Sequence, residues 1–185
     1  MRESLENSTD EEIVGLVQAG EAEIFTILIN RYEEKIRRYA RKFISNQEDI
    51  NDVLQEIFIK AYRNIQSFDI KRKFSSWLYR IAHNELVNAL KRKKTFFTVD
   101  LDVFFPFNFH KNDLDEQIDR QSMIKIIDEC LGKLSPKYRE PIVLYYLEGL
   151  SYKEIADVMQ IPISTVGIRI KRAKSIIKSI LNHKE

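Results

Sequence analysis

Residues 150–181 read LSYKEIADVMQIPISTVGIRIKRAKSIIKSIL, and this stretch decides how the rest of the chain is interpreted. Ser151 lies three residues before a glutamate, a capping-box spacing that predicts the start of a short helix. Pro162 predicts a turn after that helix, and Ser164 or Thr165 is expected to cap a second helix. A short helix, a tight turn and a longer basic helix form the helix-turn-helix pattern, whose second helix enters the major groove of DNA. The alternative is an ordinary helical hairpin with a solvated basic face.

The second helix of this pair is expected to be amphipathic and basic. Its apolar stripe consists of Val166, Ile170, Ala173, Ile177 and Leu181. Its other faces carry the cations Arg169, Lys171, Arg172, Lys174 and Lys178. No acid occurs between Ser164 and Lys184, so this helix suits a polyanionic partner.

Composition predicts a helical protein with separated charges. Glycine and proline number only 5 and 4 among 185 residues, so turns are scarce and helices should dominate. The net charge is +2, yet residues 71–94 hold eight cations against Glu85, a local charge of +7. Residues 1–30 hold seven acids against Arg2, a local charge of −6. The chain therefore combines basic surfaces that attract a polyanion with an acidic end that does not.

Several classes of site are excluded by residue type. The single Cys130 allows neither an intramolecular disulfide nor a cysteine-rich zinc site, and its apolar setting predicts a buried, inert thiol. The three histidines are too dispersed for a metal site, and no cofactor is expected. We find no phosphate-binding glycine loop and no nucleophile–base constellation, so an enzyme is not expected. No signal peptide and no apolar run of about 18 residues is found, which predicts a cytoplasmic protein.

Residues 48–65 show strong helical periodicity and carry an acidic stripe. Asp49, Asp52 and Glu56 fall on one face of this predicted helix. Acids near a helix start are often partners of the helix dipole. A face that docks on a protein is the other interpretation, and the pattern leaves both open.

Residues 66–76 are expected to form a basic loop that leads into a helix from Trp77 to Lys93. On this helix one face combines an aromatic ring with cations and amides; its members are Trp77, Arg80, Asn84, Asn88 and Lys91. Single-stranded nucleic acid needs rings for stacking bases, cations for phosphates and amides for base edges. Alternatively, Trp77 closes the core, and the two roles are compatible.

Residues 94–117 lack helical periodicity and hold six of the eleven phenylalanines. This segment is too aromatic for a freely solvated linker, so we expect it to pack on its own domains or on a partner. The sequence therefore predicts an all-α protein of two small helical domains, residues 1–93 and 118–185. A flexible, aromatic-rich linker at 94–117 joins them.

Three segments together resemble a known family. Residues 52–62 (DVLQEIFIKAY), 74–84 (FSSWLYRIAHN) and 134–144 (LSPKYREPIVL) are similar to segments of bacterial RNA polymerase sigma factors of the sigma-70 family, in the extracytoplasmic-function (ECF) group. The helix-turn-helix extends this resemblance, which covers nearly the whole chain apart from the linker. It implies a transcription initiation factor that binds core RNA polymerase, directs it through −35 and −10 promoter elements and assists melting. A stand-alone helix-turn-helix regulator is the alternative, but it needs neither the acidic stripe nor the Trp77 face.

The resemblance also implies roles for individual residues. The residues that would dock on the coiled coil of the largest polymerase subunit are Asp49, Asp52, Gln55 and Glu56. The residues that would contact the −10 element are Lys71, Lys73, Phe74, Ser75, Trp77, Arg80, Asn84, Lys91 and Arg92. The loop at 67–75 would capture a base flipped from the non-template strand. The residues that would contact the −35 element are Ser164, Thr165, Arg169, Lys171 and Arg172. Gly167 departs from the family pattern, at a position that normally faces DNA, and an anti-sigma factor is an implied partner.

Overall fold

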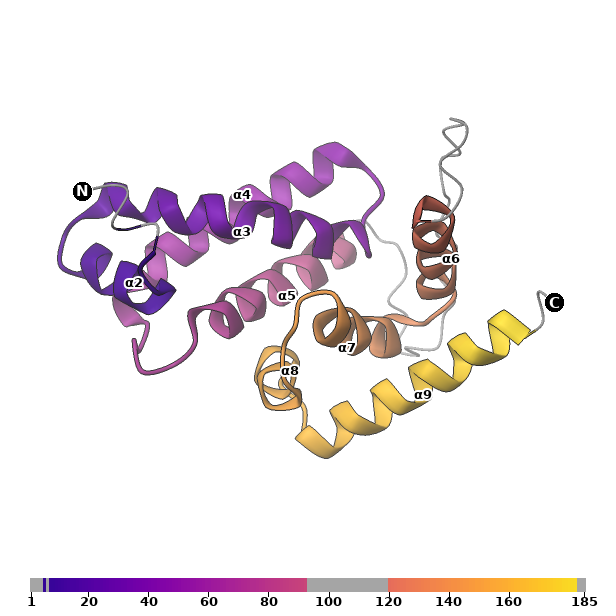
Figure 1. The fold of residues 1–185 in the computed structure, drawn as a ribbon. Helices are drawn as coiled ribbons and strands as arrows, with labels where there is room; N and C mark the ends of the chain where they lie inside the picture. The colour runs from indigo at the N-terminus through magenta and orange to yellow at the C-terminus, as the bar shows by residue number, and fades with distance from the viewer. Residues whose placement is uncertain (1–4, 6, 93–119, 183–185) are drawn as a thin grey trace. The chain divides into compact units, whose positions relative to one another are not determined.

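The computed structural model in Figure 1 describes residues 5, 7–92 and 120–182. Within these ranges every regular element is a helix, which confirms the all-α prediction. The predicted linker at 94–117 lies outside the described residues.

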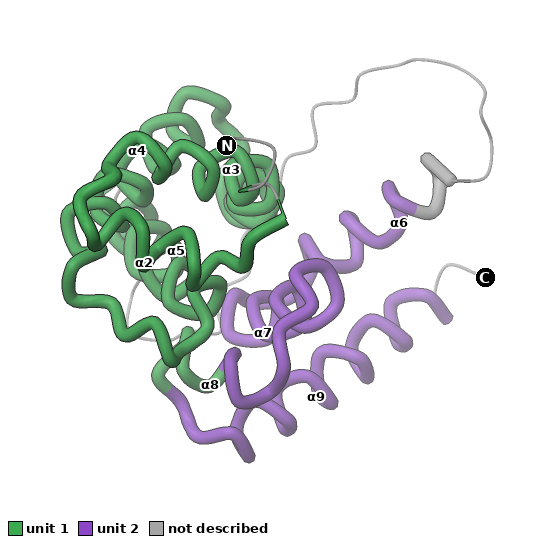
Figure 2. Tube along the Cα trace, turned by 60° about the vertical axis from the view of Figure 1, so that its left-hand side comes forward, with its two compact units in different colours: residues 1–95, 156–160 green, residues 96–155, 161–185 purple. Residues whose placement is uncertain are grey.

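The chain divides into two compact units (Figure 2). One unit contains residues 1–95 with 156–160, and the other contains residues 96–155 with 161–185. The domain limits that the sequence suggests stay a prediction.

The first unit is built from α2 to α5. The elements are α2 (Asp10–Gln18), η1 (Ala22–Ile24), α3 (Phe25–Arg41), α4 (Gln47–Asn64), η2 (Ile65–Ser67) and α5 (Phe74–Arg92). Helix α4 packs against both α3 and α5, and α2 packs against α3 and α5. Helix α3 is one continuous helix of 17 residues.

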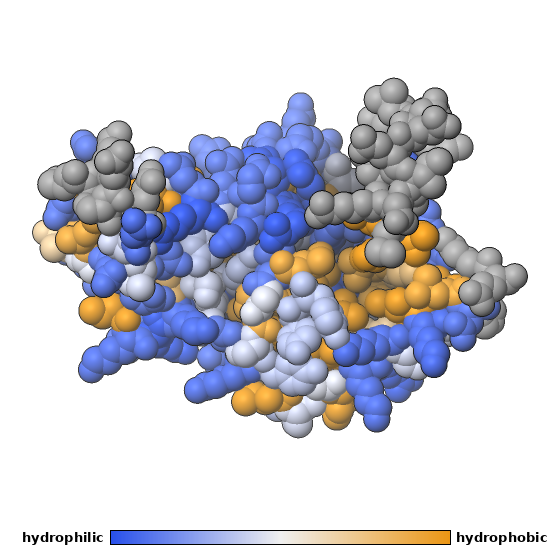
Figure 3. Space-filling view, viewed as in Figure 1, coloured by the Kyte–Doolittle hydropathy of each residue, from blue (hydrophilic) through white to orange (hydrophobic). Residues whose placement is uncertain are grey.

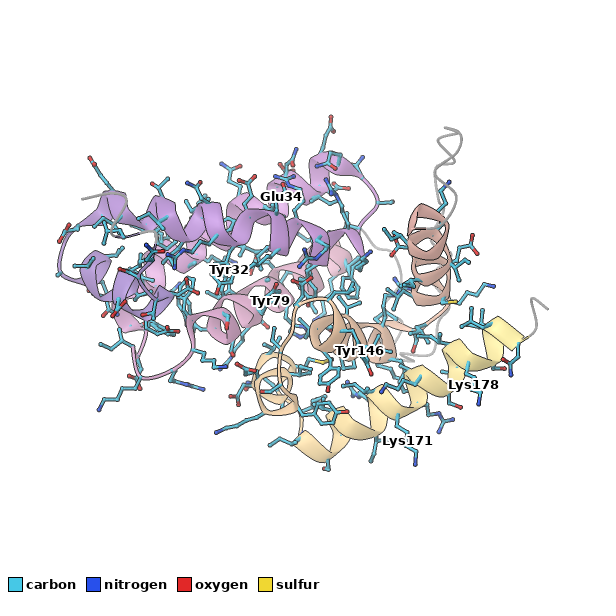
Figure 4. All side chains as sticks on the ribbon, viewed as in Figure 1. Tyr32, Glu34, Tyr79, Tyr146, Lys171 and Lys178 are labelled. Atoms are coloured by element: carbon cyan, nitrogen blue, oxygen red, sulfur yellow. The ribbon has the colours of Figure 1, made fainter. Side chains whose placement is uncertain are left out.

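The core of this unit contains large side chains from all four helices. Among its fully buried members are Ile13, Leu28, Ile36, Tyr39, Ile50, Ile57, Phe74, Leu78 and Tyr79. The Tyr39 and Tyr79 rings meet edge to face at 5.6 Å between centroids, which joins α3 to α5. Tyr32 and Tyr79 extend into the space between the helices in Figure 4.

Side chains define the start of α2, and a glycine follows its end. Thr9 and Glu12 form a reciprocal capping box at the start of α2. The neighbouring Glu11 carboxylate accepts a hydrogen bond from the Phe74 N–H. Gly20 has a φ of 109°, the left-handed conformation that glycine adopts readily after a helix.

The remaining helices are α6 (Arg120–Gly132), α7 (Pro136–Tyr146), α8 (Tyr152–Met159) and α9 (Ile163–Asn182). Helix α9 packs against α6 and α7. The buried Arg139 guanidinium joins α6 to α7, because its Nη2 donates to the Gly132 carbonyl at 2.8 Å and to the Leu134 carbonyl at 2.9 Å. Burial lowers the pKa of Arg139 to about 10.

Two helix starts differ from the sequence-based expectation. Helix α5 begins at Phe74 rather than Trp77, so the loop before it is shorter than expected. Helix α9 begins at Ile163, so Ser164 and Thr165 lie inside it and neither caps it. The Pro162 carbonyl makes the first backbone hydrogen bonds of the helix, since it accepts from the Thr165 and Val166 N–H groups at 2.9 and 3.2 Å.

The apolar stripe of α6 is buried at the end of the helix and exposed one turn earlier. Cys130 is buried, as predicted, together with Leu131. Ile126 and Ile127 belong to the same apolar rhythm in the sequence, yet they are 41% and 46% exposed. On the face drawn in Figure 3, apolar residues gather between α6 and α9.

Candidate nucleic-acid and polymerase interfaces

The acidic stripe lies on an exposed face of α4. Asp52, Gln55 and Glu56 are exposed, and Asp49 is half-buried. Asp49 belongs to the first turn, where its N–H donates to the side chain of the cap residue Asn46 at 3.0 Å. The dipole interpretation therefore fits Asp49, whereas Glu56 lies two turns further along and is free of that constraint.

A partly buried ion pair joins α4 to α5. Lys60 Nζ donates to Glu85 Oε1 at 2.6 Å, and the two side chains are 42% and 7% exposed. In the sequence, Glu85 stands out only as the single acid of the basic stretch 71–94. Its burial could have been suspected from its place beside Leu86 and Ala82 on the apolar side of the helix.

The loop before α5 is held at both ends by buried aromatic rings. Phe68 is 6% exposed and Phe74 is 1% exposed, and their ring centroids lie 5.8 Å apart. The Trp77 ring lies 5.1 Å from Phe68 and 5.6 Å from Phe74. Phe74 is therefore a core residue in this structure and not an available DNA contact, contrary to the expectation. Trp77 is half-buried, so it closes this cluster while keeping part of its ring accessible.

Between the two phenylalanines the chain is exposed. Residues 69–73 are all exposed, including the cations Lys71 and Lys73. The Asp69 carboxylate accepts from the Lys71 N–H at 3.0 Å, and the Asp69 carbonyl accepts from the Arg72 N–H at 2.9 Å, which makes a local turn.

The cation and amide face of α5 is arranged as the sequence predicts. Its exposed members are Arg80, Asn84, Asn88, Lys91 and Arg92. Ser75 is half-buried and forms a side-chain hydrogen bond with Tyr32. The hydroxyl of Tyr32 in turn donates to Asp10 at 2.5 Å, and Arg31 donates to the same carboxylate at 2.7 Å. Ser75 thus has a structural partner in addition to any role toward DNA.

Helix α9 presents a polar face opposite its buried stripe. Val166, Ile170 and Ala173 are buried, whereas Ile177 is half-buried and Leu181 is exposed. Of the predicted −35 contacts, Ser164, Lys171 and Arg172 are exposed, and Thr165 and Arg169 are half-buried. Figure 4 shows Lys171 and Lys178 extending away from the helix.

Sequence reasoning missed an apolar residue on this face. Ile168 is 65% exposed and lies between the exposed Ser164 and Lys171. Its position two residues from both Val166 and Ile170 was the available signal, because that spacing places it away from their buried stripe.

Gly167 does not face open space. A Cβ built at this position would meet the Tyr152 ring of α8 at 3.6 Å, an ordinary contact distance. Lys174, one of the cations of α9, lies over the Tyr146 ring at 5.0 Å from its centroid. A hydrogen bond with Tyr146 raises the pKa of Lys174, so the ammonium group of this lysine already has a partner in its own unit.

Neither a metal site nor a membrane span is found in the parts of the chain that the structure describes. No group of three or more metal-binding side chains occurs among those residues. None of the described helices is long and apolar enough to cross a membrane.

Comparison with known proteins gives matches over both described parts of the chain. The family model for sigma-70 region 2 matches residues 28–96, and that for sigma-70 region 4 matches residues 124–177. The chain is 34% identical over 173 residues to the ECF RNA polymerase sigma factor SigW of Bacillus subtilis, covering 89% of this chain and 92% of that protein. The chain belongs to the ECF sigma factors.

Further relatives agree with this membership. The sigma factor is 34% identical over 183 residues to the ECF RNA polymerase sigma-E factor of Haemophilus influenzae, covering 94% of this chain and 96% of that protein. Its fold is similar to the sigma factor RpoE of Bartonella quintana, solved in complex with the anti-sigma factor NepR, with a TM-score of 0.68. That match has 23% identity and covers 85% of this chain and 96% of the other.

The family gives the function of the protein. This sigma factor is a promoter-specific transcription initiation factor, and a stand-alone regulator is not favoured. The region 2 match contains α4 and α5 with the acidic stripe and the exposed loop, and the region 4 match contains α7, α8 and most of α9. Helix α2 precedes both matches.

Proposed function

We propose that this sigma factor docks on core RNA polymerase through the exposed acidic face of α4. Asp52, Gln55 and Glu56 would face the basic coiled coil of the largest subunit, with Asp49 at the edge of the contact. The observation that supports this is the exposure of these side chains on a helix whose opposite face is buried in the unit. Exposed acids facing a basic partner speed association and fix its orientation.

The −10 element would be read by the loop at 69–73 and the polar face of α5. Exposed cations on the loop suit phosphates, and the accessible part of Trp77 suits stacking against an unpaired base. Arg80 and Asn84 would line the path of the melted strand, with Lys91 and Arg92 on its phosphates. Binding energy to the opened strand drives melting, so no catalytic step by the sigma factor is required.

The −35 element would be contacted by α9, through the exposed Ser164, Lys171 and Arg172 with Thr165 and Arg169 beside them. The protein would act in the cytoplasm with the polymerase. We also infer an anti-sigma factor as a partner, since the similar Bartonella structure is a complex of that kind.

Capture of core polymerase tests the docking face. Immobilised wild-type protein should retain purified bacterial core RNA polymerase, and Asp52→Lys/Glu56→Lys should weaken retention by at least about 30-fold, because charges at such contacts are worth several kcal/mol. The matched control is Glu21→Lys/Glu23→Lys, which changes the net charge equally at two exposed acids outside α4. Equal capture by both variants would move the docking contact away from α4.

A further inference from the structure

Helix α2 lies outside the family matches and outside the proposed interfaces, yet it contacts both ends of the loop at 69–73. At the first end, Gln18 Nε2 donates to the Ile65 carbonyl at 2.7 Å and to the Phe68 carbonyl at 2.8 Å. These two carbonyls belong to the segment where the chain leaves α4. One side-chain amide therefore uses both of its hydrogens to fix this exit.

At the second end, α2 caps the helix that follows the loop. Glu11 Oε1 accepts from the Phe74 N–H at 2.8 Å. Phe74 is the first residue of α5, where the N–H groups have no partner inside the helix and a negative charge is favourable. The carboxylate thus fixes the point at which the chain enters α5.

Only a short exposed segment remains between these two fixed points. Phe68 and Phe74 are buried against each other, and the five residues between them are exposed. The turn made by Asp69 restrains these residues further. The shape of the loop is therefore set by its ends, and α2 holds both ends.

We propose that α2 is the positioning element of the loop, with Gln18 and Glu11 as positioning residues for base selection in the −10 element. This inference rests on the proposed role of the loop in capturing a flipped base. A captured base is read by hydrogen bonds and packing in a fitted pocket, which requires a loop ordered before the base arrives. Without Gln18 or Glu11, the residues of the loop at 69–73 are still present but poorly ordered. Selection between bases therefore falls more than general binding to DNA.

The test measures base preference in the reconstituted holoenzyme. A promoter library randomised at the −10 element of the non-template strand is bound to each holoenzyme, and the bound fraction is sequenced. Gln18→Ala and Glu11→Ala are expected to reduce the preference at the position read by the loop by about fivefold, the factor that corresponds to about 1 kcal/mol from one hydrogen bond. Preferences in the −35 element should stay unchanged.

Three variants separate positioning from a general loss of stability. Glu11→Gln keeps an oxygen that can accept from the Phe74 N–H, so it should retain the preference that Glu11→Ala loses. Thr9→Ala removes the capping box of α2 without touching the loop, so it should also retain the preference. Ile70→Gly changes the exposed tip of the loop itself and should abolish the preference at the same position.

The results distinguish positioning of the loop by α2 from base reading by the loop itself. Selective loss in Gln18→Ala and Glu11→Ala, with retention in Glu11→Gln and Thr9→Ala, supports the inference. Loss in Ile70→Gly alone overturns the positioning role of α2 and leaves base reading by the loop intact. Retained preference in Ile70→Gly overturns base reading by the loop and the inference with it. A uniform loss at all promoter positions, or an equal loss in Thr9→Ala, overturns the inference because it indicates only a structural role for α2.

Discussion

The Lys60–Glu85 ion pair allows a quantitative test of the packing between α4 and α5. Lys60→Met keeps an apolar stem of similar length and removes the charge. It leaves the Glu85 carboxylate, whose side chain is only 7% exposed, without the ammonium group now 2.6 Å away.

The expected cost follows from the unequal exposure of the two partners. Removing one member of a fully buried pair costs about 3–5 kcal/mol, whereas exposed pairs contribute about 0–1 kcal/mol. Because the Lys60 side chain is 42% exposed, water can partly replace it beside the carboxylate. We therefore expect Lys60→Met to lower the free energy of unfolding by about 2 kcal/mol, between the two limits.

Trp77 provides the assay. It is the single tryptophan of the chain and lies on α5, the helix that carries Glu85, so its fluorescence reports unfolding of the unit that contains the ion pair. If the free energy of unfolding falls by about 2 kcal/mol for each molar of urea, a loss of about 2 kcal/mol lowers the urea midpoint by about 1 M. The control is Arg63→Met, which removes an exposed cation one turn later on α4 and should change the midpoint little.

A double variant identifies the source of the loss. In Lys60→Met/Glu85→Leu both charges are replaced by apolar groups, and stability should return close to the wild-type value. A single variant within about 0.5 kcal/mol of wild type would refute the reasoning, because Glu85 would then be solvated well enough without its partner. A double variant as unstable as the single one would also refute it, since the loss would then come from packing of the lysine stem.

Three further outcomes are expected. Burial, and then the hydrogen bond to Asp10, raises the pKa of Tyr32 well above its ordinary value of 10.0. Because Tyr32 ionises first in the unfolded chain, the free energy of unfolding should fall as the pH rises above 10.0. Urea unfolding should show a less steep fall in Tyr32→Phe. Gly167→Ala should stabilise α9 by up to about 1 kcal/mol, because alanine favours the helix more than glycine and the added methyl meets the Tyr152 ring at an ordinary 3.6 Å. A lower melting temperature in thermal unfolding followed by circular dichroism would contradict this. The exposed Ile168 should contact a thymine methyl group in the −35 element. Replacing each thymine in turn by uracil should therefore weaken promoter binding by the wild-type holoenzyme at one position, and should not weaken binding by Ile168→Ala there. Equal sensitivity of both proteins would exclude the contact.

The helices of this protein could be predicted because their apolar residues recur at the helical period. The exposed acidic stripe follows from the same periodicity: once Val53 and Ile57 are assigned to the core, Asp52 and Glu56 must lie on another face. The polar face of α5 was predictable for the same reason. These are properties of single helices, which sequence spacing describes directly.

The features that were missed depend on contacts between distant residues. Phe74 was expected to contact DNA, but it is buried beneath Phe68 and Trp77, and no spacing rule distinguishes a loop aromatic that is buried from one that is exposed. Gln18 bonds to carbonyls 47 and 50 residues away, and Glu11 bonds to an N–H 63 residues away. Polar residues on the flank of an amphipathic helix give no sign of such partners before the fold is known.

The start of α9 was misplaced for a local reason. Ser164 and Thr165 are strong cap formers, so they were preferred over the residue before them. The helical backbone bonds already start at the Pro162 carbonyl, which accepts from the Thr165 and Val166 N–H groups, and Pro162 cannot itself extend α8 because it lacks an N–H. Side-chain preference was therefore a poor guide where the backbone alone completes the turn.

The buried phenylalanines on either side of residues 69–73 also bear on how such proteins diverge. Since Phe68 and Phe74 are held in the core, the exposed residues between them can be exchanged with little effect on the folding of the unit. With the proposed reading of the −10 element by residues 69–73, a change of promoter preference needs only a few substitutions within this short segment and no compensating change elsewhere. On that proposal, exchanging this segment between members of the family changes promoter specificity while α4, the proposed polymerase-binding helix, stays the same.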